Sequence, residues 1–198
     1  DRWRTELSGR GLTVALADGE DERVIRAAIA LHTESIVDVR VFGDGTRISR
    51  QAQALGLTLP VGLIADVTET SGDPVIRSAL ETAHANKPEA LPSALADPIC
   101  VASAALKTGQ VDACVAGAAR PTADVLRAGL RIVGLASGVR TLSSCFLLLL
   151  SDGRQLTFSD CAVVPDPESE QLADIALDAA KTHHSLTGDT PKVAMLSF

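Results

Sequence analysis

The sequence has few aromatic residues, no closely spaced cysteines and no long apolar run, and each absence excludes a class of protein. Aromatic residues are 3% of the 198 residues while 46% are hydrophobic, so the core is expected to be aliphatic. The four cysteines form no C-x-x-C and the four histidines have no ligand spacing, so no metal site is predicted. Without a signal-peptide pattern or an apolar run of spanning length, we expect no membrane association.

The charge of the chain argues against two classes of partner, and its cysteines indicate the cellular compartment. The formal net charge is −7, the isoelectric point is near 5.0 and no long positive block occurs, which argues against nucleic acid or an anionic membrane as a partner. The cysteines lie far apart, at Cys100, Cys114, Cys145 and Cys161. Most of them fall in apolar runs, so we interpret them as reduced core thiols of a cytoplasmic protein.

The first two thirds of the chain alternate short apolar runs with segments of helical periodicity. Strands are expected over 12–17, 37–42, 61–67 and 111–116, and helices over 22–34, 47–55, 74–85, 98–108 and 122–133, with a loop over 86–92. Such alternation predicts an α/β fold, in which a parallel sheet carries helices on both faces in a three-layer αβα arrangement. No G-x-G-x-x-G follows a strand, so a dinucleotide site has no support.

The pattern changes after a small, flexible segment at 134–138, which suggests a first domain over 1–136 and a second over 137–198. Asp152-Gly153 between two apolar runs predicts a β-hairpin. Asp166 and Pro167 are expected to begin a helix that ends at Gly188, and 192–198 is expected to be a strand. We interpret this part as the incomplete front of a second α/β domain, and we expect that both chain ends were cut from a longer polypeptide.

A candidate site lies between 111 and 130, where a buried strand, a small-residue turn and a helix follow one another. Thr122 is predicted to be the helix N-cap, and the free backbone N–H groups near Gly117 and Thr122, at the positive end of the helix dipole, favour an anion. Arg127, one turn further on, could reach the same place with its forked donors, which makes a phosphate cradle. Alternatively, this is an ordinary α/β unit in which Arg127 only pairs with Asp124.

Four stretches in order resemble the phosphate acetyl/butyryltransferase family, and the likeness covers nearly the whole chain as an N-terminal portion. They are Asp18-Gly19-Glu20-Asp21-Glu22-Arg23, Ala116-Gly117-Ala118 with Pro121-Thr122-Ala123-Asp124-Val125-Leu126-Arg127, Asp160-Cys161-Ala162-Val163 before Pro165 and Pro167, and Lys192-Val193-Ala194-Met195-Leu196-Ser197-Phe198. The resemblance implies two α/β domains around a cleft, as in isocitrate and isopropylmalate dehydrogenases. It also implies transfer of acetyl between coenzyme A and phosphate, no cofactor beyond coenzyme A as substrate, and a homodimer.

The resemblance also assigns roles to residues. Arg127 matches the phosphate-binding arginine, and Thr122 and the Gly117 backbone match the turn beneath it. Arg120 stands where the family has His or Thr and could add a second cation to the phosphate site, or face solvent. The family's Ser-Arg-Pro segment and its catalytic Asp would lie beyond Phe198, so no general base is expected within these residues. Asp160 either lines the cleft or caps a neighbouring loop.

Departures from the family pattern leave two interpretations open. Ala116 replaces a serine, Pro121 replaces a threonine, and Lys87 is the one fixed cation in a segment where the family has several. The chain is either the front part of an active phosphate acyltransferase, acetyl-specific by default with butyryl as the other acyl group, or an inactive acyltransferase-like domain. The inactive domain would serve regulation or oligomerisation, as in fusions to malic enzymes.

Overall fold

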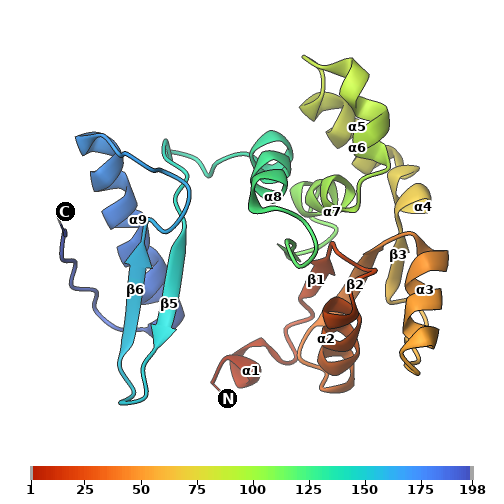
Figure 1. Cartoon of the computed structure of the whole chain (residues 1–198), viewed down its shortest axis with the longest axis horizontal. Helices are drawn as coiled ribbons and strands as arrows, with labels where there is room; N and C mark the ends of the chain where they lie inside the picture. Colours follow the sequence, from red (N-terminus) through yellow and green to blue (C-terminus); the bar gives the residue numbers. More distant parts are fainter. Residues whose placement is uncertain (1, 197–198) are drawn as a thin grey trace. The chain divides into compact units, whose positions relative to one another are not determined.

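The structure, a computed structural model, describes residues 2–196, and the chain divides between Gly134 and Leu135 into two units (Figure 1). The first unit contains a parallel sheet with helices, and the second contains a hairpin and one long helix. Among residues 2–196 no single helix is long and apolar enough to cross a membrane, although the bent pair Pro88–Leu95 and Pro98–Lys107 meets the length and composition criteria together.

The sheet of the first unit has four parallel strands in the order β3-β2-β1-β4. The strands are β1 (Thr13–Leu16), β2 (Asp38–Gly43), β3 (Ile64–Asp66) and β4 (Ala113–Val115). At the end of β1, Leu16 is in register with Val41 on one side and Val115 on the other. The predicted parallel α/β sheet is therefore confirmed, with β1 in the interior.

Aspartates begin five helices of this unit, because a short carboxylate can accept hydrogen bonds from backbone N–H groups that have no partner in the first turn. Such aspartates precede α2 (Glu22–Thr33), α3 (Gly45–Ala54), α4 (Val67–Ser71), α5 (Pro74–Ala83) and α7 (Pro98–Lys107). The other helices are α1 (Arg2–Leu7), η1 (Pro88–Ala90), α6 (Leu91–Leu95), α8 (Thr122–Ala128) and the π-helical turn η2 (Gly129–Val133).

The expected loop over 86–92 is wrong, because η1 and the start of α6 lie there. Both helices carry a proline in their first turn, at Pro88 and Pro92. A proline in the first turn sacrifices no helical hydrogen bond, since that N–H would have no partner in any case. The two prolines of this segment are thus compatible with helix starts.

Side chains on β1 alternate between two apolar clusters, one on each face of the sheet. Ala15 and Ala17 belong to a cluster with α5, α7, α8 and η2, whereas Leu16 belongs to a second cluster with α2 and α3. This period of two is what a strand requires when both of its faces are covered. The first unit is therefore the three-layer αβα arrangement that the sequence predicts.

Strand β4 is less buried than expected. Val111, just before it, is 2% exposed, but Val115 at its end is 59% exposed. Within the described part of the chain β4 pairs with β1 alone, so it forms an edge of the sheet. The prediction of a buried strand is therefore wrong for β4 itself: a run of apolar residues shows that a strand is present, but it does not show which position the strand takes in the sheet.

The second unit contains an antiparallel hairpin of β5 (Cys145–Leu149) and β6 (Gln155–Ser159), followed by α9 (Ser169–Thr187). The hairpin is confirmed, but α9 begins later than predicted, with Glu168 and Gln171 forming a capping box. Gly188 ends α9 with a φ of 79°. No strand occurs over 192–196 of the expected strand 192–198, and 197–198 lie outside the described residues.

Candidate functional site

The sheet order reverses at β1, because the strands that follow it in the chain are placed first on one side of it and then on the other. From β1 the chain passes to β2 and β3 on one side, and it later returns to β4 on the other side. In open parallel sheets, ligands bind beyond the carboxyl ends of the strands at such a switch point. A cavity of about 420 Å³ lies at this end of the sheet, and its lining includes Asp18, Glu20, Asp44, Arg47, Thr68 and Arg120.

Asp18 connects the two strand ends at the switch point. It follows β1, and its Oδ2 accepts hydrogen bonds from the backbone N–H groups of Gly117 at 2.7 Å and Ala118 at 3.0 Å, in the turn after β4. The Asp18 residue is 8% exposed. Gly117 has a φ of +96°, which a residue with a side chain rarely adopts. Of the N–H groups that the sequence assigns to an anion, those at Gly117 and Ala118 are therefore bound to a carboxylate of the chain itself.

Arg23, near the start of α2, binds a carbonyl group of the same Gly117–Ala118 turn. One of its terminal nitrogens donates to the backbone oxygen of Ala118. Asp21, the N-cap of α2, fixes this guanidinium through two hydrogen bonds, at 2.9 Å from Nε and 2.7 Å from Nη2. The hydrogen bond from the Arg23 side chain lowers the pKa of Asp21 to about 2. Two N–H groups and one carbonyl of the turn are thus bound by side chains of the segment 18–23.

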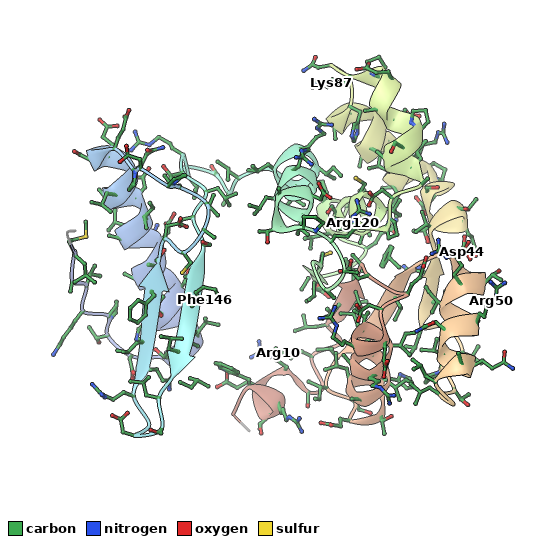
Figure 2. The ribbon with its side chains drawn as sticks, in the orientation of Figure 1. Arg10, Asp44, Arg50, Lys87, Arg120 and Phe146 are labelled. Carbon is green, nitrogen blue, oxygen red and sulfur yellow. The ribbon has the colours of Figure 1, made fainter. Side chains whose placement is uncertain are left out.

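The two predicted cations, Arg120 and Arg127, meet on one carboxylate. Arg127 donates to Asp124 Oδ1 at 2.8 Å, and Arg120 lies 3.7 Å from Asp124 Oδ2. Arg120 also pairs at 2.9 Å with Asp97, the N-cap of α7, and this hydrogen bond raises the pKa of the guanidinium. Figure 2 labels Arg120 at the end of the turn that leads into α8. The ion pair between Arg127 and Asp124 is the contact expected of an ordinary helix.

Thr122 does not cap α8, contrary to the prediction. The helix begins with Thr122 itself, and the cap position is occupied by Pro121, whose φ of −59° and ψ of 143° are extended. Proline has no hydroxyl or carboxylate to accept a hydrogen bond, and no side chain caps this helix. The helix starts at Thr122 as predicted, and only the cap assignment is wrong, because it relied on the preference of threonine for N-caps.

Lys87 lies away from these groups. It occupies the cap position of η1, is exposed, and sits in Figure 2 at the outer end of the α5–α6 region, far from Arg120.

Sequence reasoning missed Arg47, which lines the cavity and pairs with Glu20 at 2.6 Å. Its signal is its place in the first turn of α3, the helix that follows the end of β2. Among residues 2–196 no group of three His, Cys, Asp or Glu side chains could hold a metal ion.

In the second unit Asp160 organises the loop that follows β6. Its Oδ1 accepts from the Ser144 backbone N–H at 2.6 Å and hydroxyl at 2.7 Å, and its Oδ2 accepts from the N–H groups of Val163 and Val164 at 2.8 and 2.9 Å. Desolvation raises the pKa of Asp160, but the hydrogen bonds from Val164 and Ser144 outweigh it and hold the pKa well below its usual range. These contacts match a loop-capping aspartate.

The four cysteines are free, and they are less buried than core thiols. Cys145 is exposed, and the other three are partly buried. The expectation of core thiols is therefore wrong for Cys145, which lies on a strand of the two-stranded hairpin, whereas Cys100 on α7 and Cys114 on β4 pack against the core of the first unit. An apolar run again identified the strand but not its exposure.

Comparison with known proteins identifies the family. Residues 4–198 match the family profile described as phosphate acetyl/butaryl transferase. The chain is 37% identical to a phosphate acetyltransferase of Clostridium acetobutylicum, over 93% of this chain and 58% of that protein. It is 35% identical to a phosphate acetyltransferase of Staphylococcus aureus, over 98% of this chain and 60% of that protein.

Solved structures agree with the sequence relatives. A phosphotransacetylase from Streptococcus pyogenes matches all of this chain and 60% of its own with a TM-score of 0.88 and 28% identity. The EutD phosphotransacetylase from Staphylococcus aureus matches 99% of this chain and 59% of its own with a TM-score of 0.84 and 33% identity. The chain thus spans about three fifths of the length of these relatives, and it belongs to the phosphate acetyl/butaryl transferase family.

Proposed function

We propose that the protein containing this chain transfers acetyl between coenzyme A and inorganic phosphate, converting acetyl-CoA and phosphate into acetyl phosphate and free coenzyme A. The observation that carries this proposal is the match over residues 4–198 to the family, together with relatives at 35–37% identity that are named phosphate acetyltransferase. Acetyl is preferred to butyryl because both of these relatives are named for acetyl transfer.

Arg127 is the proposed phosphate ligand, with Arg120 as a second cation and with Thr122 and Gly117 as parts of the turn beneath them. A guanidinium suits phosphate because its parallel N–H donors match two phosphate oxygens. Arg127 is 62% exposed on its side chain, so a ligand can reach it, although it must then share Arg127 with Asp124. The transferred acetyl group also passes through a tetrahedral state whose oxyanion needs nearby donors.

The thiol of coenzyme A needs a general base, because the thiolate is the nucleophile in the reverse direction. We propose that the base, and a second phosphate-binding segment, belong to the part of the relatives that this chain does not match. The 198-residue chain tested alone is then expected to be inactive. Neither Asp18 nor Asp160 is assigned as the base, because both carboxylates are engaged with backbone N–H groups.

A second candidate function is an acyltransferase-like domain without activity that serves regulation or assembly. The specific observation in its favour is that several of the donors expected to bind phosphate already have partners. The Gly117 and Ala118 N–H groups bind Asp18, and Arg120 and Arg127 bind Asp97 and Asp124. The activity assay separates this candidate from the enzyme.

The test is an assay of the complete natural polypeptide for acetyl phosphate formation from acetyl-CoA and phosphate, with the 198-residue chain measured in parallel. Acetyl phosphate from the complete polypeptide supports the enzyme, and substitution of butyryl-CoA in the same assay ranks the two acyl groups. A complete polypeptide that unfolds cooperatively but makes no acyl phosphate would rule out the enzyme in favour of the second candidate.

We further propose that the protein is a cytoplasmic homodimer. The free state of the four cysteines agrees with a reducing compartment. Light scattering of the complete polypeptide tests the assembly, and a mass equal to one chain would reject the dimer.

A further inference from the structure

The turn at Gly117 and Ala118 is held by both ends of one short segment, 18–23. Asp18 takes two consecutive N–H groups of the turn on a single oxygen, Oδ2, and Arg23 takes the Ala118 carbonyl. Three polar backbone groups of a two-residue turn are therefore engaged by side chains about 95 to 100 residues away in the sequence. Backbone groups on a turn ordinarily satisfy themselves within the turn or with water, so this arrangement fixes the turn from outside.

The contact with Asp18 has a consequence for anion binding. An N–H group that points at a carboxylate oxygen 2.7 or 3.0 Å away cannot also bind a phosphate oxygen. A phosphate beside these groups would also face the negative charge of Asp18 in a largely buried position, where repulsion is weakly screened. A phosphate near this turn must therefore be bound by side chains rather than by the turn itself.

The turn leads directly to those side chains. Arg120 follows Ala118 by two residues, and α8, which carries Arg127, begins two residues after Arg120. The path and orientation of the turn thus determine where the side chains of Arg120 and Arg127 leave the backbone. An error of about 1 Å in the placement of a binding group can cost about 100-fold in rate.

We propose that Asp18 and Arg23 are positioning residues that clamp the Gly117–Ala118 turn and thereby hold Arg120 and Arg127 in place for phosphate. The inference rests on the proposed function of these two arginines in phosphate binding. It gives a role to the segment 18–23, whose acidic residues are otherwise explained as helix caps. Asp18 and Arg23 act through the turn and do not touch the substrate.

Two substitutions at each position separate positioning from other effects. Asp18→Asn keeps an oxygen that can accept both N–H groups, whereas Asp18→Ala removes the acceptor. Arg23→Lys keeps a charged donor, and Arg23→Gln removes the charge. Arg26→Gln is the matched control, because Arg26 is also on α2, is also exposed and also pairs with a carboxylate, Glu22 at 2.8 Å, but does not reach the turn.

The measurements are steady-state kinetics of the complete polypeptide with phosphate and with acetyl-CoA varied separately. We expect Asp18→Ala to lower kcat/KM for phosphate by about 100-fold. Arg23→Gln should lower it by about tenfold, as for the loss of a charge-assisted hydrogen bond. Asp18→Asn and Arg23→Lys should recover most of the loss, KM for acetyl-CoA should change little, and Arg26→Gln should behave as wild type.

A decrease in KM for phosphate, instead of a loss of kcat/KM, would also be informative. If Asp18 instead occupies a phosphate position and competes with the substrate, Asp18→Ala and Asp18→Asn will both lower KM for phosphate, and the proposal is overturned. Equal losses for phosphate and acetyl-CoA in Asp18→Ala and Arg23→Gln, with no recovery in Asp18→Asn or Arg23→Lys, would show a general structural role and would also overturn it.

Amide hydrogen exchange tests the clamp independently of activity, which keeps this inference distinguishable from the proposed function. In the complete polypeptide, peptides that cover residues 114–121 should exchange faster in Asp18→Ala and Arg23→Gln than in wild type and Arg26→Gln. Faster exchange in a protein without any acetyl transfer would retain the clamp and reject the proposed function. Unchanged exchange in both variants would overturn the clamp itself, whether or not the enzyme is active.

Discussion

Arg127 and Asp124 are joined across one turn of α8 by a hydrogen bond of 2.8 Å, and Arg120 approaches the other oxygen of the same carboxylate at 3.7 Å. Asp124 therefore holds two cations close to each other near the start of α8. A dianion that binds both guanidinium groups must offset the attraction that Asp124 exerts on each of them. If the two arginines bind phosphate as proposed, this carboxylate would keep them close together before phosphate binds, and its negative charge would weaken their binding of phosphate.

Replacing Arg127 with alanine should separate binding from stability. We expect KM for phosphate to rise by about tenfold or more, because a charge-assisted hydrogen bond is lost. The free energy of unfolding should change by less than about 0.5 kcal/mol, since the pair with Asp124 is exposed to solvent. Initial rates and thermal unfolding of the complete polypeptide measure both quantities. Arg50→Ala, on the exposed side of α3 (Figure 2), is the charge-matched control, and phosphate kinetics unaffected by Arg127→Ala would remove Arg127 from the site.

Replacing Asp160 with alanine should destabilise the second unit by about 2–4 kcal/mol, because four partly buried donors, two from Ser144 and two from the loop after β6, lose their acceptor at once. Urea unfolding followed by circular dichroism measures the change. Asp152→Ala is the control: Asp152 also accepts from a backbone N–H and from an arginine, but in an exposed hairpin turn. Its cost should stay below about 1 kcal/mol. A cost for Asp160→Ala as small as that for Asp152→Ala would show that the Asp160 cluster adds no more to stability than an exposed turn does.

The low pKa of Asp160 predicts how the free energy of unfolding depends on pH. The pKa of Asp160 is lower in the folded chain than the ordinary value of 3.8, so near that pH the unfolded chain binds more protons. Its contribution is complete above the ordinary pKa and is lost as pH falls, from about pH 5 downward. Asp66, whose pKa is lowered chiefly by the Gly45 N–H, acts in the same direction. Urea midpoints between pH 7 and pH 3 should fall less steeply in Asp160→Asn than in wild type, and parallel slopes would contradict the assignment.

Thiol reactivity should follow burial. Desolvation, with a smaller effect of Asp97 at Cys100 and of Asp18 at Cys114, raises the pKa of both thiols to about 11. At pH 8 almost none of either is the reactive thiolate, whereas Cys145 is exposed. Iodoacetamide followed by peptide mapping should therefore label Cys145 well before Cys100 and Cys114. Labelling of Cys114 as fast as Cys145 would mean that β4 opens readily, and full labelling in urea confirms that each thiol is free.

Periodicity and local chemistry predicted the parallel sheet, the hairpin and most helix starts, because these depend on nearby residues. Asp73 before Pro74 and Asp97 before Pro98 are caps whose function needs only the next three residues. The exposure of β4 could not be predicted in this way. It depends on which strands lie beside it, and that is a property of the whole sheet.

The candidate site was predictable only in part, for the same reason. The turn at Gly117 and the pair of Arg127 with Asp124 are local, and the sequence identified both. The partner of the turn, Asp18, comes from a strand end 99 residues earlier, and no spacing rule connects them. The signal that could have found it is topological: β1 and β4 become neighbours only if the chain reverses direction in the sheet after β3.

That separation in sequence has a consequence for how the protein folds. Strands β1, β2 and β3 can pair as soon as each emerges during synthesis, because each neighbours the one before it. Pairing of β1 with β4 must instead wait for the intervening helices and close a loop of almost a hundred residues, which is entropically slow. The clamp between Asp18 and the Gly117 turn is therefore among the last contacts of the first unit to form, so until β4 pairs with β1 the chain carries the two arginines without the contacts that position them.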